Sequence, residues 1–186
     1  MEENNGNVGS NGNVEINGNI GVSGKYTNNG TPIGFTSITP FIVVKNPSEA
    51  IAFYQNIFGA RVKDITEFPD GNGNQIIVHA ELDFGNGFLQ LGAANPDYKL
   101  VLPPDADNAC YSLAIYVVNA DQVFENAVTN GAKVREPISS FVSGDRYGSI
   151  LDPFGVRWSI MTRIEDLSEE ESSRRVADWA KSFSGE

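Results

Sequence analysis

The chain has 186 residues, a formal net charge of −11 at pH 7 and a hydrophobic content of 40%, which is enough for a buried core. The acidic balance argues against nucleic acid as a partner, because phosphate binding needs a basic surface, and no apolar run approaches the ~20 residues that span a bilayer. The single cysteine, Cys110, excludes an intrachain disulfide. We therefore expect a cytoplasmic protein without nucleic-acid or membrane partners, whose acidic surface serves solubility or attracts a cationic small molecule.

Residues 1–35 form an N-terminal segment dominated by Asn and Gly. Such a composition buries too little apolar surface to offset the entropy of an ordered chain. Within it, Asn17-Gly18 stands between short alternating runs over 14–20, which is the signal of a type I′ hairpin. We expect a flexible tail or a weak hairpin, and assign no chemistry to it.

The predicted domain covers residues 36–165, and its first module covers 36–93. A β-branched and aromatic run predicts a strand at 37–44, and Asn46-Pro47 then predicts the start of a helix that ends at Gly59. Three further strands are predicted at 61–67, 75–83 and 88–92. A proline-containing linker follows at 94–109.

The second module, residues 110–165, repeats this order. A β-rich run at 111–118 precedes a helix that Asn119 caps and Gly131 ends. The segment 131–134 then repeats 59–62, and 152–159 has the form of 83–90. The sequence thus predicts an α+β fold of two tandem βαβββ modules. A C-terminal helix within 166–186 either packs on its own domain or latches a partner subunit.

The repeated unit resembles the vicinal oxygen chelate superfamily, which includes glyoxalase, bleomycin-resistance and dioxygenase-like proteins. The segments at 79–82, 144–148, 152–155 and 157–159 resemble its PhnB-like branch. The resemblance implies that the eight strands curl into a mixed sheet around a cup. It also implies a small-molecule site in that cup, often within a homodimer.

Enzymes of this superfamily hold a divalent metal with one side chain from the first and one from the fourth strand of each module. The matching positions here are Thr39, Gln90, Ser112 and Ser159. Hydroxyls and an amide are poor ligands for zinc, nickel or ferrous iron. We therefore expect no metal cofactor, and a divalent metal at an atypical site is the alternative.

His79, Glu81 and Asp83 alternate along one predicted strand, so they share a face. Hairpin pairing places Phe88 and Gln90 on the same face. His79 and Glu81 are the candidate catalytic pair, and they also fit ligand-orienting groups or, with Gln90, weak metal ligands. The plainer interpretation is a pair of polar residues on a half-solvated sheet.

Aromatic and basic residues complete the predicted ligand site. Phe41, Phe88 and Tyr116 occupy concave positions and would stack a planar ligand, unless they belong to the core. Arg146 and Arg157 are also predicted on the concave face, where they hold an anionic group or pair with Glu81 or Asp83. Trp158 is expected on the helix-facing side, as a packing residue.

Two functions are consistent with these features. The leading hypothesis is a metal-independent protein that sequesters an antibiotic or a metabolite. The alternative is a metal-dependent lyase, isomerase or dioxygenase with an atypical site around His79, Glu81 and Gln90. The sequence leaves open whether the protein is an enzyme.

Overall fold

A computed structural model describes residues 21–104 and 108–183. Of the described residues, those from 21 to 39 belong to one compact unit and those from 40 onward to another, and each unit is described by itself. In the first unit, β1 (Thr27–Asn28) pairs with β2 (Thr31–Pro32). The connecting Asn29 and Gly30 have φ angles of 46° and 80°, as a type I′ turn requires. The hairpin predicted at 14–20 lies outside the described residues.

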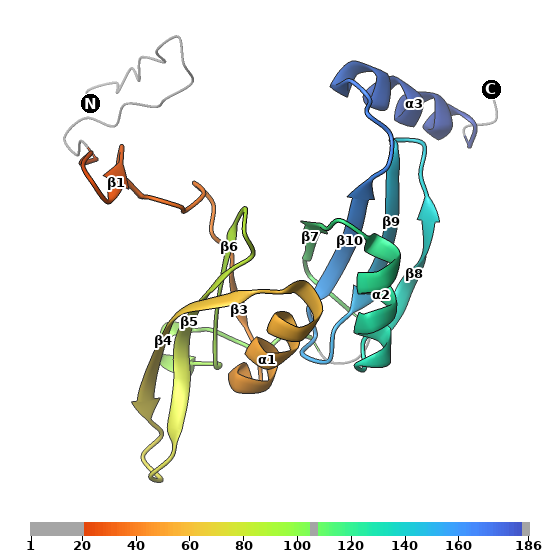
Figure 1. Ribbon diagram of the computed structural model, residues 1–186. Coiled ribbons are helices and arrows are strands. Elements are labelled where there is room, and N and C mark those ends of the chain that lie inside the picture. Colours follow the sequence, from red (N-terminus) through yellow and green to blue (C-terminus); the bar gives the residue numbers. More distant parts are fainter. Residues whose placement is uncertain (1–20, 105–107, 184–186) are drawn as a thin grey trace, which may run out of the picture. The chain divides into compact units, whose positions relative to one another are not determined.

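The second unit begins with the first module, a four-stranded mixed sheet in the order β3-β6-β5-β4 with helix α1 (Figure 1). The edge strand β3 starts after Pro40, four residues later than the predicted 37–44. Pro40 has no N–H for a ladder, and its carbonyl accepts from the Gln90 N–H. The elements are β3 (Phe41–Val43), α1 (Pro47–Phe58), β4 (Arg61–Pro69), β5 (Gln75–Asp83) and β6 (Phe88–Gly92).

The second module repeats this topology as a sheet in the order β7-β10-β9-β8, with helix α2. In both modules the first strand is parallel to the fourth and the other pairings are antiparallel. The predicted linker contains a short 3-10 helix, η1 (Pro96–Tyr98). The elements are β7 (Ser112–Tyr116), α2 (Ala120–Thr129), β8 (Lys133–Ser140), β9 (Asp145–Leu151) and β10 (Arg157–Arg163). The predicted α+β fold of two βαβββ modules is confirmed, and its eight strands form one four-stranded sheet per module.

The helix caps follow the sequence signals in part. The Asn119 side chain accepts from the Gln122 N–H at 3.1 Å, as predicted. Asn46 occupies the N-cap position of α1 but makes no side-chain capping bond. Gly59 has a φ of 68° after α1, a conformation that glycine adopts without strain.

The core lies on the helix-facing sides of both sheets. Alternate residues of β5 and β6 are buried there, namely Ala80, Leu82, Leu89 and Leu91. Trp158 from the second sheet is 3% exposed, and its ring contacts those of Tyr54, Phe58 and Phe84 from the first module. Trp158 is therefore a packing residue, as predicted, and the two modules share one core.

A buried carboxylate also joins the modules. Asp152 Oδ2 accepts from the Tyr54 hydroxyl at 2.7 Å and from Trp158 Nε1 at 2.9 Å. Its Oδ1 accepts from the backbone N–H groups of Phe154 and Val156. Burial raises the pKa of Asp152 and that of Tyr54. The turn between β9 and β10 thus also carries a contact between the modules.

The C-terminal helix α3 (Glu169–Lys181) is capped by Ser168, whose hydroxyl accepts from the Glu171 N–H. It packs on its own chain, since Ser172 Oγ donates to the Ser143 carbonyl at 2.9 Å and Trp179 meets Phe141 edge to face. No helix in the described part of the chain is long and apolar enough to cross a membrane.

Candidate functional site

The predicted ligand residues of the first module share the side of their sheet that faces away from α1, here called the first outer face. Gln90 on β6 pairs with Phe41 on β3 and with Glu81 on β5, and Phe88 pairs with Asp83. Paired residues in a sheet point to the same side, so the predicted common face is present.

His79 and Glu81 have different neighbours on the first outer face. The Glu81 carboxylate accepts from Gln90 Nε2 at 3.0 Å. The His79 ring stacks on that of Phe41, with 6.0 Å between centroids and 25° between planes. The two side chains thus contact separate neighbours, and no hydrogen bond joins His79 to Glu81 among the described residues.

Asp83 forms an ion pair with Arg61 from its own sheet rather than with Arg146 or Arg157. Arg61 Nη2 lies 2.8 Å from Asp83 Oδ2. A hydrogen bond from the Gly85 N–H, together with Arg61, lowers the pKa of Asp83. Within one chain, Arg146 pairs with Asp121 and Arg157 with Glu136 instead of the predicted Glu81 or Asp83.

The second outer face is the corresponding side of the other sheet, and its centre is a carboxylate that sequence reasoning missed. Glu136 Oε2 accepts from the Tyr147 hydroxyl, from Ser149 Oγ at 2.6 Å and from Arg157 Nη2 at 2.8 Å. The hydroxyls of Ser149 and Tyr147, and then Arg157, lower the pKa of Glu136. Partial burial and the adjacent Glu136 raise the pKa of Tyr147. Arg157 thus lies on the predicted face, paired with Glu136.

The repeat contains a signal that points to Glu136. It follows Gly131 at the same interval as Asp64 follows Gly59, and both are acidic. Asp64 pairs with Glu81 on the third strand of its module, and Glu136 pairs with Ser149 on the third strand of its own. Aligning the second strands of the repeat would have placed both carboxylates on the outer faces.

Arg146 lies on the opposite side of the second sheet, so its predicted place beside Arg157 is wrong. Its guanidinium makes a two-pronged contact with Asp121 at the start of α2, with bonds of 2.6 and 2.9 Å. Gly148, two residues on, also faces this helix, because a Cβ there would meet the Phe124 ring at 2.8 Å. The hydrogen bonds from Arg146 lower the pKa of Asp121.

The length of one turn explains this error. Residues 84–87 separate the paired Asp83 and Phe88, whereas residues 152–156 separate the paired Leu151 and Arg157. The second turn is one residue longer. A shift of one residue moves every side chain of a strand to the other face, so the equal spacing of the two motifs in sequence was misleading.

The positions that match the superfamily's metal ligands do not provide a donor set that fits a transition metal. Gln90 uses its amide nitrogen on Glu81, and Ser112 Oγ lies 3.4 Å from Ser159 Oγ. Thr39 precedes β3. Neutral hydroxyls and an amide do not match the thiolate, imidazole and carboxylate ligands of zinc or iron. Among the residues described, no group of three His, Cys, Asp or Glu side chains is arranged around a metal-sized space.

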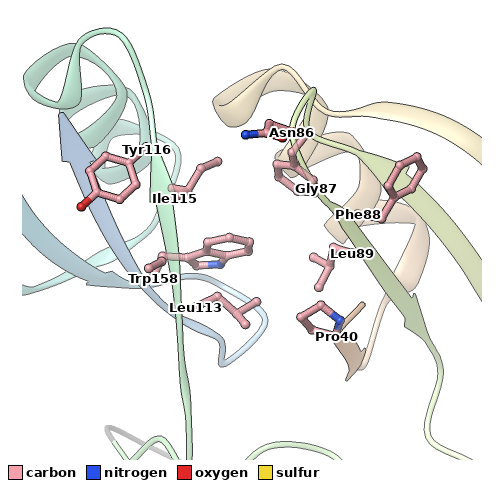
Figure 2. A pocket seen from close by; sticks show the side chains of 11 residues that line it. Pro40, Asn86, Gly87, Phe88, Leu89, Leu113, Ile115, Tyr116 and Trp158 are labelled. Carbon is pink, nitrogen blue, oxygen red and sulfur yellow. The ribbon is translucent and has the colours of Figure 1, made fainter. Parts of the chain in front are cut away.

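A cavity of about 310 Å³ lies between β6 and β7. Figure 2 shows Leu89 and Pro40 on one wall, and Leu113, Ile115 and Trp158 on the other. Phe88 and Tyr116 also belong to its lining, but their rings point away from this space, as expected from the alternation with Leu89 and Ile115. The predicted aromatic ligand residues of one chain therefore lie on two different faces. Phe41 and Phe88 lie on the first outer face, Tyr116 lies on the second, and the two faces point in different directions.

Two mycobacterial proteins are similar to this chain in sequence. An uncharacterized protein of Mycobacterium bovis is 28% identical over 138 residues, which are 73% of this chain and 88% of that protein. An uncharacterized protein of Mycobacterium tuberculosis has the same identity, over 79% of its length.

Solved structures show the same fold. PA1353 from Pseudomonas aeruginosa has a TM-score of 0.56 at 23% identity, covering 69% of this chain and 98% of that one. A PhnB protein from Bacillus cereus has a TM-score of 0.54 at 20% identity, covering 68% and 99%. The fosfomycin resistance protein FosX from Listeria monocytogenes has a TM-score of 0.55 at 13% identity, covering 74% and 97%.

A family model matches residues 34–160, from before β3 to the middle of β10, and so spans both βαβββ modules except the end of the last strand. The match confirms the resemblance that the repeat suggested in the sequence. The chain belongs to the Glyoxalase/Bleomycin resistance protein/Dioxygenase superfamily.

Proposed function

We propose that the protein binds and sequesters a small molecule, an antibiotic or a metabolite, without a metal. The observation that carries this proposal is the chemistry of the positions matching the metal ligands, where Gln90, Ser112 and Ser159 replace imidazole and carboxylate groups. Around them, the outer faces offer partly exposed rings and hydrogen-bonding groups, which are the groups that orient organic ligands.

The site is proposed to form in a homodimer. In one chain, the first and second outer faces do not share a space, because Phe88 and Tyr116 point away from the gap between β6 and β7. A second copy would place the first outer face of one chain opposite the second outer face of the other. The edge strands β3 and β7, each hydrogen-bonded on one side in these sheets, are available to extend across such an interface.

The alternative enzyme would need a metal around His79, Glu81 and Gln90. One solved structure similar to this chain is FosX of Listeria monocytogenes complexed with Mn(II). At 12% sequence identity, this similarity shows the fold alone. In this chain the Gln90 amide nitrogen is directed to Glu81, and the His79 ring is stacked on Phe41. These contacts favour organic-ligand binding over metal coordination.

Metal analysis and ligand binding together test the proposal. We expect the purified protein to contain far less than one equivalent of zinc, nickel, manganese or iron per chain. Treatment with a chelator should leave the shift in melting temperature caused by a bound ligand unchanged. A panel of cationic glycopeptides and planar drugs supplies the ligands. Near-stoichiometric metal that is lost in His79→Ala would establish the enzyme alternative instead.

A further inference from the structure

The carboxylate of Glu136 is held by three donors from two neighbouring strands. Tyr147 and Ser149 come from β9 and Arg157 comes from β10. All three donate to Oε2, and among the described residues no hydrogen bond to Glu136 uses Oε1. A carboxylate fixed through one oxygen presents the other as an oriented acceptor.

This carboxylate lies on the second outer face, where a ligand would reach it. Glu136 pairs with Ser149, Ser149 with Ser159, and Ser159 with Ala114, so it belongs to a row that crosses the whole sheet. The Glu136 side chain is 47% exposed. Ser159 and its neighbour Ser112 continue the polar row toward β7.

The charges of the cluster indicate which ligand group it accepts. Arg157 Nη2 donates to both Glu136 Oε2 and Ser149 Oγ, so this nitrogen is already used within the cluster, whereas Glu136 keeps Oε1 for a donor from outside it. The donors around Glu136 stabilise its ionised form. The chain as a whole carries a net charge of −11, which concentrates cations rather than anions at its surface.

We propose that Glu136 is the anionic anchor of the ligand site and accepts a hydrogen bond from a protonated amine or amidine of the ligand. Tyr147, Ser149 and Arg157 are positioning residues that fix its Oε2. This inference rests on the proposed binding function and gives it a ligand class. In the proposed dimer, Glu81 of the first outer face supplies a second carboxylate, held by Gln90, on the other side of the same space.

Three naphthalene probes of nearly equal shape test the ligand class. Naphthylmethylamine is cationic at neutral pH, naphthylmethanol is neutral and naphthoate is anionic, and their affinities are measured by fluorescence titration or calorimetry. We expect the amine to bind most tightly. Tighter binding of naphthoate, weakened by Arg157→Gln, would instead make Arg157 the anchor of an anionic ligand and overturn the inference.

A matched pair of variants then locates the anchor. Glu136→Gln should weaken amine binding about tenfold, as the loss of a charge-assisted hydrogen bond does, and leave naphthylmethanol unchanged. Glu49→Gln, at an exposed position on α1, makes the same change in net charge and should change neither affinity. Equal effects of the two variants on the amine would show only general charge attraction, and would contradict the inference.

The two proposals fail separately. If all three probes bind equally well and Glu136→Gln has no effect, the ligand class is wrong while small-molecule binding stands. The order of the three wild-type affinities needs no variant, so the inference stays testable if Glu136→Gln folds poorly.

Discussion

At the scale of single residues, two carboxylates organise the second module in different ways. Asp152 is buried and accepts four hydrogen bonds, two of them from the side chains of Tyr54 and Trp158. Glu136 is half exposed and accepts three. Burial raises the pKa of Asp152, whereas hydroxyl and guanidinium donors lower the pKa of Glu136. The first joins the modules, and the second is available to a ligand.

The bond between Tyr54 and Asp152 is expected to stabilise the folded chain. Tyr54→Phe removes the hydroxyl and leaves Asp152 Oδ2 with one donor fewer in a buried site. Loss of a buried hydrogen bond to a charged group costs about 1–3 kcal/mol. Urea denaturation should show this loss in the free energy of unfolding. Tyr98→Phe, on a tyrosine that is 78% exposed, is the control and should have little effect; equal losses would contradict the role of this bond.

At the scale of elements, strand alternation and turn length determine which face each residue occupies. The alternation along β5 correctly predicted the shared face of His79 and Glu81. On β9 the same reasoning failed for Arg146, because the following turn has one more residue than its counterpart. A strand's pattern gives two sets of side chains, and only the pairing shows which set faces the helix.

Helix α3 is held by an ion-pair network centred on one residue. Glu171 accepts from Arg174 and Arg175, and Arg175 also pairs with Glu165 in the preceding segment. Hydrogen bonds from both arginines lower the pKa of Glu171 from 4.5 to about 2. Because the pKa in the folded state lies below its ordinary value, the stabilisation is present above pH 4.5 and is lost as the pH falls through about 2.

Glu171→Gln should therefore loosen α3 at neutral pH but have a diminishing effect under acid conditions. NMR chemical shifts of the α3 amides, followed from neutral pH downward, measure this change. Glu169→Gln is the control, because it lies in the same helical turn and changes the net charge by the same amount but removes no ion pair with Arg174 or Arg175. It should have a smaller effect. A difference between wild type and Glu171→Gln that does not depend on pH would rule out this explanation.

At the scale of the whole molecule, the proposed site requires two chains. Phe41 on β3 is 37% exposed and Tyr116 on β7 is 58% exposed, each on the outer face of an edge strand. In the proposed dimer these faces are opposite each other, so a charge placed on either would be buried at the interface. Buried unpaired charges are strongly unfavourable.

We therefore expect the wild-type protein to sediment as a dimer at micromolar concentration, and Phe41→Lys and Tyr116→Lys to weaken the dimer at least about tenfold. Val118→Lys, at a residue that is 97% exposed just beyond β7, is the matched control and should remain dimeric. Sedimentation velocity distinguishes these outcomes. A wild-type protein that is monomeric at this concentration would refute the dimeric site.

The sequence by itself determined the architecture and part of the site. Helix caps and turn residues predicted the elements of both βαβββ modules, because these signals depend on neighbours close along the chain. The internal repeat then carried the resemblance to the superfamily. Alternation on β5 placed His79 and Glu81 on one face for the same reason, and pairing across the short hairpin added Gln90 on β6. Only the tertiary structure decided the pairings between distant segments: Tyr54 with Asp152, Arg157 with Glu136 and Arg146 with Asp121. Strand register determines how many residues each turn contains, and packing determines which of many exposed charges pair. Local sequence patterns specify neither.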